Sequence, residues 1–223
     1  MKLFGVSLSP YYERNMILLS LKGAVDKVEA GGVPEGGIRS PAHLAVNPLG
    51  HIPYLETDDG AILPEGQIIA EYLDAKFDGP AMVSDDPDKA AHEKLIARIV
   101  DVHVFRALWP LLMATAWGRI DEKAVEESKV SLPIALDSLD HFMSDSLRAS
   151  GDDWSVADCA MIPLMFSANL CCDKYGISVL GDRPKLNAWW NNAKDSDVVV
   201  ESHARMQASL EAIMAMMAKQ AKA

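Results

Sequence analysis

Residues 47–73 read NPLGHIPYLETDDGAILPEGQIIAEYL, and the turn and helix signals in this stretch decide the fold of the chain around it. Pro53 can only open a strand, because proline offers no N–H to a strand ladder and holds the preceding residue in extended geometry. Residues 54–57 and 61–63 are then expected to form two short strands, joined by a turn at Asp58-Asp59-Gly60. The sequence therefore predicts a β-hairpin with an extended backbone at Ile52, just before it.

A helix is expected directly after this hairpin. Apolar residues follow Pro64 at helical spacing, so the helix should begin within a residue or two of Glu65. The first amides of a helix have no intrahelical partner, and together with the helix dipole they form a site for a carboxylate. The extended backbone of Ile52 and this helix start are suited to holding a short acidic peptide.

These residues resemble the amino-terminal, thioredoxin-like domain of the cytosolic glutathione transferases. In that family an N-P-x-G-x-[IV]-P-x-L segment places a cis-proline beside the cysteine of glutathione, and a P-E-S-x-x-I-x-x-Y-L segment holds the γ-glutamyl carboxylate. The matching positions here are Asn47, Pro48, Gly50, Ile52, Pro53 and Leu55, followed by Glu65, Gly66, Ile69, Tyr72 and Leu73. The resemblance implies a cis Pro53 and a glutathione site formed by Ile52, Pro53, Glu65 and Gly66.

Gly66 departs from the family pattern, which has serine or threonine at this position. Glycine keeps the backbone N–H and loses the hydroxyl, and a lost hydrogen bond to a charged group is worth roughly 1.5 to 3 kcal/mol, or about ten- to a hundredfold in affinity. The resemblance gives two neighbours open roles. His51 either meets the glycyl carboxylate of glutathione or is an exposed loop histidine, and Gln67 either approaches the γ-glutamyl end or faces solvent.

The candidate catalytic residue is Ser9. Residues 2–6 are expected to form a strand, and Pro10 is suited to the first position of the helix that follows. The segment SPYYER, residues 9–14, resembles the C-P-[FY]-x-E-R of omega-like transferases and the C-P-Y-C of glutaredoxins, which implies a bacterial, serine-type transferase. A serine hydroxyl can donate to the glutathione thiolate but cannot form a mixed disulfide, so conjugation is favoured over thiol transfer. Alternatively Ser9 only caps the helix, with Ser7, Tyr11 or Tyr12 as the donor.

The chain is long enough for two domains. It has 223 residues with 49% apolar content, and its composition breaks around residues 78–87. We expect an α/β thioredoxin-like domain over residues 1–78, a linker over 79–87, and an all-α domain over 88–223. This arrangement is the glutathione-transferase fold.

The all-α domain is expected to begin with two long helices over residues 88–117 and 121–148, bent by Pro110 and Pro133. Further on, Ser155-Val156-Ala157-Asp158 forms an N-terminal capping box. The same [ST]-x-A-D box starts a buried helix in glutathione transferases, so it is a second resemblance to the family.

The resemblance implies that a second, apolar substrate binds in an acceptor pocket. The candidate residues for this pocket are Tyr11, Tyr12, His103, Trp109 and Met113. The last three lie on one expected helix, where an aromatic stripe is more often core than pocket.

Charge and composition argue against several partners. The formal net charge of -11 disfavours nucleic acid and anionic membranes, which require a concentrated basic face. No segment reaches membrane-spanning length and no signal peptide is visible, so a cytoplasmic protein is expected. Cys159, Cys171 and Cys172 lack metal-binding spacing and are expected to be buried reduced thiols, with no metal site.

The predicted function is nucleophilic attack of the glutathione thiolate, with glutathione as co-substrate, on a small hydrophobic electrophile. The resemblance also implies a homodimer. Ether cleavage, dehalogenation and double-bond isomerisation use the same thiolate and stay open, although the zeta-type serine-serine-cysteine signature is missing, which weakens maleylacetoacetate isomerase. A non-catalytic interaction module with the same fold is the alternative from another class, and Gly66 favours it slightly.

Overall fold

The computed structural model describes residues 1–220, and the chain divides into two compact units. The first unit contains residues Met1–Ala81 together with the chain from Val200 onward, and the second contains Met82–Val199. This division differs from the predicted one at its C-terminal end, where helix α9 (Asp197–Gln220) contributes most of its length to the first unit.

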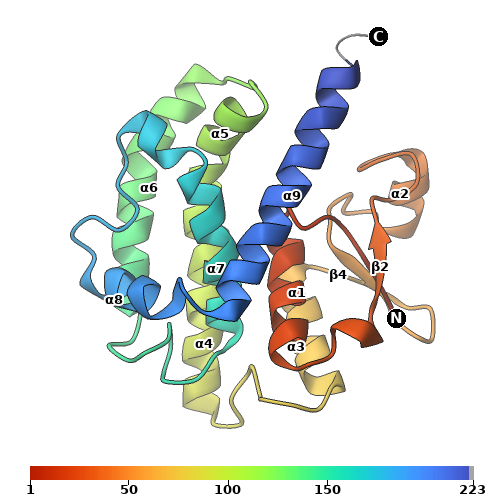
Figure 1. The fold of residues 1–223 in the computed structure, drawn as a ribbon, viewed down its shortest axis with the longest axis horizontal. Helices are drawn as coiled ribbons and strands as arrows, with labels where there is room; N and C mark the ends of the chain where they lie inside the picture. The colour runs from red at the N-terminus through yellow and green to blue at the C-terminus, as the bar shows by residue number, and fades with distance from the viewer. Residues whose placement is uncertain (221–223) are drawn as a thin grey trace. The chain divides into compact units, whose positions relative to one another are not determined.

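The first unit is built on a mixed four-stranded sheet (Figure 1). Its strands are β1 (Lys2–Phe4), β2 (Glu29–Gly32), β3 (Tyr54–Glu56) and β4 (Ile62–Pro64), in the order β2-β1-β3-β4. β1 runs parallel to β2 and antiparallel to β3, which is antiparallel to β4. The predicted hairpin is confirmed, because β3 and β4 are paired and the N–H of Thr57 donates to the carbonyl of Ala61 across the turn at 2.9 Å.

Helices α1 (Pro10–Leu21) and α3 (Gly66–Lys76) pack against each other, and the short helix α2 (Pro41–Val46) follows β2. A 3-10 helix, Val25–Lys27, precedes β2. The core of this unit includes the side chains of Leu3, Ile17, Leu55, Ile69 and Leu73, each at most 1% exposed. α1 is buried on more than one face, because α9 runs alongside it (Figure 1) and carries polar side chains that contact it.

The second unit is helical within the residues that the structure describes. Its elements are α4 (Pro87–Ile99), a π-helix (Val100–Val104), α5 (Phe105–Ala116), α6 (Glu122–Phe142), α7 (Val156–Asn169), a 3-10 helix (Cys172–Tyr175) and α8 (Pro184–Ala193). Every residue of α7 except Asn169 is buried, so this helix forms the centre of the unit. The predicted capping box at its start is confirmed: the Ser155 hydroxyl accepts from the helix backbone, and the carboxylate of Asp158 accepts from the N–H of Ser155 at 3.0 Å.

The helix boundaries differ from the prediction at two places. The helix expected over 88–117 is interrupted by the π-helix Val100–Val104, while Pro110 lies inside α5. The second expected helix ends at Phe142, six residues before its predicted end at 148, because Met143 is extended and Ser144 starts a turn that bonds Ala149. A proline removes one backbone donor and crowds one carbonyl, but neighbouring packing can hold the helix together across it.

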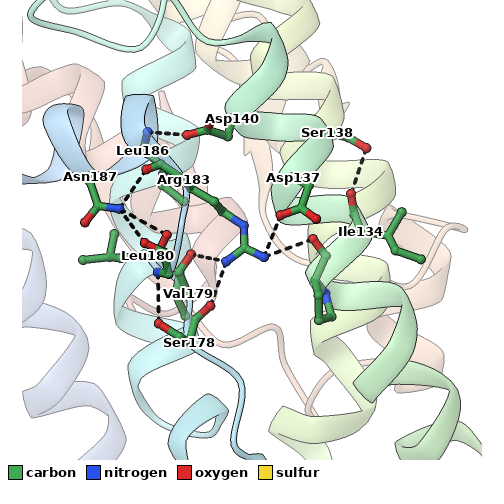
Figure 2. Close-up of polar contacts among 12 residues, drawn as sticks. Ile134, Asp137, Ser138, Asp140, Ser178, Val179, Leu180, Arg183, Leu186 and Asn187 are labelled. Atoms are coloured by element: carbon green, nitrogen blue, oxygen red, sulfur yellow. Dashed lines mark hydrogen bonds and ion pairs between the residues drawn. The ribbon is translucent and has the colours of Figure 1, made fainter.

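The loop before α8 is fixed to α6 by Arg183 (Figure 2). Its guanidinium donates to the carbonyls of Ser178 at 2.8 Å and Val179 at 3.0 Å on the loop. The other side of the same group donates to the carbonyl of Pro133 at 3.2 Å and contacts the carboxylate of Asp137 at 2.8 Å on α6. Arg183 therefore joins this part of the loop to α6. Within residues 1–220, no helix has both the length and the apolar character needed to cross a membrane.

Candidate active site

Three segments of the first unit meet at one end of its sheet. Phe4 of β1 is paired with Tyr54 of β3, and Tyr54 is paired with Pro64 of β4. Because these strands are antiparallel, the last residue of β1, the first of β3 and the last of β4 share an edge. The loop that leads to Ser9, the peptide before Tyr54 and the start of α3 therefore all leave the sheet at this edge.

Ser9 is the residue before the first turn of α1 and has an extended backbone. Its N–H donates to the carbonyl of Val6 at 2.9 Å, and its own carbonyl accepts from Glu13 at 2.9 Å in the first turn of the helix. Its side chain makes no capping hydrogen bond, although a serine at this position commonly does. The half-buried hydroxyl is thus not occupied as the cap of α1.

The peptide bond between Ile52 and Pro53 is cis, as expected. Pro53 is buried and Ile52 is half-buried. The carbonyl of His51 accepts from the side-chain amide of Asn47 at 3.0 Å, which fixes the loop, while the imidazole of His51 is exposed.

The start of α3 contains a strained residue followed by a tightly packed glycine. Glu65 has a φ of 73°, a left-handed conformation that non-glycine residues rarely adopt, and strain of this kind often lies at ligand sites. Gly66 is buried, and a Cβ added there would stand 2.7 Å from the backbone oxygen of Tyr11. The first turn of α3 therefore lies directly against the first turn of α1.

The side chain of Gln67 makes two contacts that the sequence did not predict. Its side-chain oxygen accepts from Arg14 at 3.2 Å, and its amide nitrogen donates to Glu71 at 3.0 Å. The half-buried side chain thus links α3 to α1.

The two tyrosines of the SPYYER segment lie in different environments. Tyr12 is 5% exposed and packs on Gly5, where an added Cβ would meet the tyrosine ring at 2.4 Å. Burial raises the pKa of the Tyr12 hydroxyl. Tyr11 is half-buried, and the guanidinium of Arg14 lies 5.4 Å from its ring centre.

Sequence reasoning missed the polar contacts that join the Ser9 loop to α9. The buried carboxylate of Glu13 accepts two hydrogen bonds from Arg205, at 2.9 and 2.7 Å, and the N–H of Leu8 donates to the hydroxyl of Ser209 at 3.2 Å. Burial raises the pKa of Glu13, and the charge of Arg205 acts in the opposite direction. No local sequence pattern predicts the pair of Glu13 and Arg205, because the two residues are separated by 192 positions.

The candidate acceptor residues of the second unit do not all gather in one place. His103 lines a cavity of about 780 Å³ bordered by α5 and α6, together with Arg106 and Ser128. Trp109 and Met113, one turn apart on α5, are absent from the lining of this cavity, and Trp109 is 48% exposed.

The sheet order, the cis-proline at the sheet edge and the helical second unit define the glutathione-transferase fold. Residues 3–81 match the family model described as "Glutathione S-transferase, N-terminal domain". This match supports the glutathione transferase family for the chain.

Similar proteins cover nearly the whole chain. The maleylacetoacetate isomerase of Pseudomonas aeruginosa is 28% identical over 93% of this chain and 95% of its own length. Glutathione S-transferase 3 of Zea mays is 28% identical over 85% of this chain and 87% of its own length. Among solved structures, glutathione transferase F7 from Populus trichocarpa superposes with a TM-score of 0.76 at 26% identity, covering 92% of this chain and 98% of that one.

Proposed function

We propose that the chain is a glutathione-dependent enzyme in which Ser9 stabilises the glutathione thiolate for attack on an apolar electrophile. The observation that carries this proposal is the meeting of the Ser9 loop, the cis peptide at Pro53 and the start of α3 at one sheet edge. The Ser9 side chain makes no capping bond, which leaves its hydroxyl for a ligand.

In this proposal glutathione is held mainly by backbone groups. The backbone at Ile52 pairs with the peptide, and the first N–H groups of α3, from Gly66 on, donate to the γ-glutamyl carboxylate. The carboxylate of Glu65 receives the γ-glutamyl ammonium group, and the exposed imidazole of His51 contacts the glycyl carboxylate.

The chemistry follows from the acidity of the bound thiol. A hydroxyl that donates to the sulfur, together with the positive end of α1, favours the thiolate, which is the reactive form. The thiolate forms a carbon–sulfur bond with the electrophile, and the displaced group leaves with the bonding electrons. The second unit supplies the acceptor pocket in this proposal, with Trp109 and Met113 as candidate contacts.

Double-bond isomerisation is the second candidate, because the chain is similar to a maleylacetoacetate isomerase over almost its full length. The same thiolate would add to a double bond, allow rotation about the resulting single bond, and leave again. Glutathione consumption separates the two reactions: conjugation consumes one glutathione per turnover, whereas isomerisation regenerates it.

Retention on immobilised glutathione tests the proposal against a non-catalytic interaction module. We expect the chain to be retained and to be eluted by free glutathione. Glu65→Gln should bind glutathione roughly ten- to a hundredfold more weakly, because a hydrogen bond between charged groups is lost. Glu56→Gln, at an exposed position of β3, is the matched control and should bind like the parent. Passage of the parent through the column without retention would support the interaction module.

A homodimer is proposed on the family resemblance. Sedimentation velocity of the parent should give the mass of two chains, and a monomer at all concentrations would overturn this part of the proposal.

A further inference from the structure

Two adjacent cysteines lie at the junction between α7 and the following 3-10 helix. Cys171 follows the end of α7, and Cys172 is the first residue of the 3-10 helix Cys172–Tyr175. Neither takes part in a disulfide, and each is 1% exposed. The thiol of Cys171 donates to the carbonyl of Ser167 at 3.6 Å, which orients it at the end of α7.

The two cysteines are adjacent in the chain, and each thiol affects the pKa of the other. The neighbouring thiol raises the pKa of Cys171 and lowers that of Cys172. Two thiols on adjacent residues can bind the same third atom after a rearrangement of their side chains. Soft thiolate ligands of this kind favour soft, polarisable centres.

A cavity lies beside this pair. It has a volume of about 510 Å³, and Cys172 is one of its lining residues. Its apolar wall contains Met165, Ile177, Val179, Leu180 and Trp190. The cavity therefore offers room for an apolar group next to a sulfur atom.

The loop that forms one wall of this cavity is held in place by the side chains of Arg183 and Asn187. Arg183 binds the carbonyls of Ser178 and Val179 and joins them to α6, as Figure 2 shows. The side-chain amide of Asn187 donates to the carbonyl of Leu180 at 3.2 Å. These bonds fix the loop that forms one wall of the cavity.

We propose that Cys171 and Cys172 form a dithiol site for a trivalent arsenical that carries one apolar substituent, with the substituent in the cavity bordered by Cys172. The reagent is an arsenoxide, in which arsenic bears the substituent and one oxo oxygen. Both S–H bonds break, two arsenic–sulfur bonds form, and the oxygen leaves with the two protons as water. Arsenic stays trivalent, so the step requires no oxidant or reductant.

The pair should hold arsenic far more tightly than a single thiol does. Once one sulfur has reacted, the second attack is intramolecular, and its effective concentration is set by the adjacent residue. An excess of glutathione, which attacks with one thiol at a time, should therefore fail to remove the arsenical. A small dithiol such as 2,3-dimercaptopropanol should remove it.

Phenylarsine oxide tests the proposal on the full, reduced and folded chain. One equivalent is added, the sample is challenged with excess glutathione, and the intact mass is recorded under non-denaturing conditions. We expect the parent to keep one phenylarsenic group, and Cys171→Ser and Cys172→Ser to retain it about a hundredfold more weakly. Cys159→Ser, at a buried cysteine on α7, is the matched control and should behave like the parent.

Melting temperature provides a second readout that also reports folding of the variants. The arsenical should raise the melting temperature of the parent and of Cys159→Ser, and leave that of folded Cys172→Ser unchanged. Methylarsine oxide should be released faster than phenylarsine oxide, because the methyl group fills less of the cavity. Equal release rates would overturn the role of the cavity.

Two results would overturn the dithiol site itself. One is labelling of the parent only after it has been unfolded in urea, which would mean that the pair is sealed inside the folded chain. The other is retention by Cys171→Ser or Cys172→Ser equal to that of the parent. Both outcomes are independent of glutathione catalysis, because the assay measures arsenic bound to the chain.

Discussion

Gly66 lies in the candidate site and also at the point where α3 packs against α1. The family pattern has a hydroxyl at this position, and its loss alone would weaken glutathione binding. In this chain the space that a side chain would need is occupied by the backbone of Tyr11, whose oxygen stands 2.7 Å from an added Cβ. The glycine therefore allows α3 to approach α1 more closely than a serine would.

Gly66→Ser is predicted to destabilise the chain by about 1 to 3 kcal/mol, because an added Cβ at 2.7 Å forces a backbone shift. The new hydroxyl should not produce the ten- to hundredfold gain in glutathione affinity that a simple added bond would give. Urea unfolding and glutathione titration measure the two effects. Gly66→Ala is the matched control and should lose the same stability. Unchanged stability with tighter binding for Gly66→Ser would contradict this explanation.

At the level of elements, α9 is tied to the first unit by polar contacts with α1 and with the loop before it. The Arg205 guanidinium contacts a carboxylate that is fully buried on α1, and Ser209 holds the backbone of the loop that carries Ser9. A buried charge that loses its partner is strongly unfavourable. Removal of Arg205 should therefore disturb α1 and the Ser9 loop as well as α9.

Arg205→Gln is predicted to lower the free energy of unfolding at pH 8 by roughly 2 to 3 kcal/mol. This loss is smaller than that expected for a fully buried ion pair, because the Arg205 side chain is 31% exposed. Burial already raises the pKa of Glu13, and loss of the Arg205 charge raises it further. A raised folded-state pKa gives stability that is present below the unfolded value and lost as pH rises through the folded value. The deficit should therefore shrink as the pH falls from 8 towards the ordinary pKa of a glutamate.

The matched control for this experiment is the double variant Glu13→Gln/Arg205→Gln, measured by urea unfolding at each pH. Without the carboxylate at position 13, the double variant should not gain stability relative to the parent as the pH falls, whereas the single variant should. An Arg205→Gln deficit that is constant over this pH range would show that Glu13 is not the group responsible.

α7 is a second element whose behaviour follows from local chemistry. Its Asp158 carboxylate is fully buried and accepts from the backbone of Ser155, the backbone of Ala149 and the indole of Trp189, the last at 2.7 Å. The capping box therefore joins the start of α7 to its preceding loop and to α8.

Ser155→Ala is predicted to lower the free energy of unfolding by about 0.5 to 2 kcal/mol, because the helix loses its side-chain cap. Activity per folded molecule should not change. Ser138→Ala is the control: Ser138 bonds a carbonyl on the exposed side of α6 (Figure 2), and its loss should change stability by less than about 0.5 kcal/mol. Equal melting temperatures for Ser155→Ala and the parent would rule out the capping contribution.

At the scale of the whole molecule, the parts that could be predicted are those with local chemical signals. Proline and glycine positions predicted the hairpin, the start of α1 at Pro10 and the start of α3, while the family resemblance predicted the cis peptide before Pro53. Ser155 and Asp158 predicted the start of the buried helix α7, because a capping box can be recognised from four consecutive residues.

The parts that could not be predicted depend on distant contacts. The sequence does not show that α9 joins the first unit, because the Glu13–Arg205 pair spans 192 positions. Nor does it show that Gln67 bonds Arg14, or that the Ser9 side chain makes no capping bond. The π-helix at Val100–Val104 was likewise not predicted, since the only irregularity that the sequence indicated in this stretch was Pro110, which lies inside α5.

The central claim is that Ser9 lowers the pKa of the thiol of bound glutathione, and a pH titration of thiolate absorbance measures this directly. The parent should hold the bound thiol at a pKa below that of free glutathione. Ser9→Ala should move the bound-thiol pKa back towards the free value and lower turnover by on the order of a hundredfold, with glutathione affinity nearly intact. Ser20→Ala, near the other end of α1, is the control and should match the parent. An unchanged bound-thiol pKa together with unchanged turnover in Ser9→Ala would contradict the account and transfer the role to Tyr11 or Ser7.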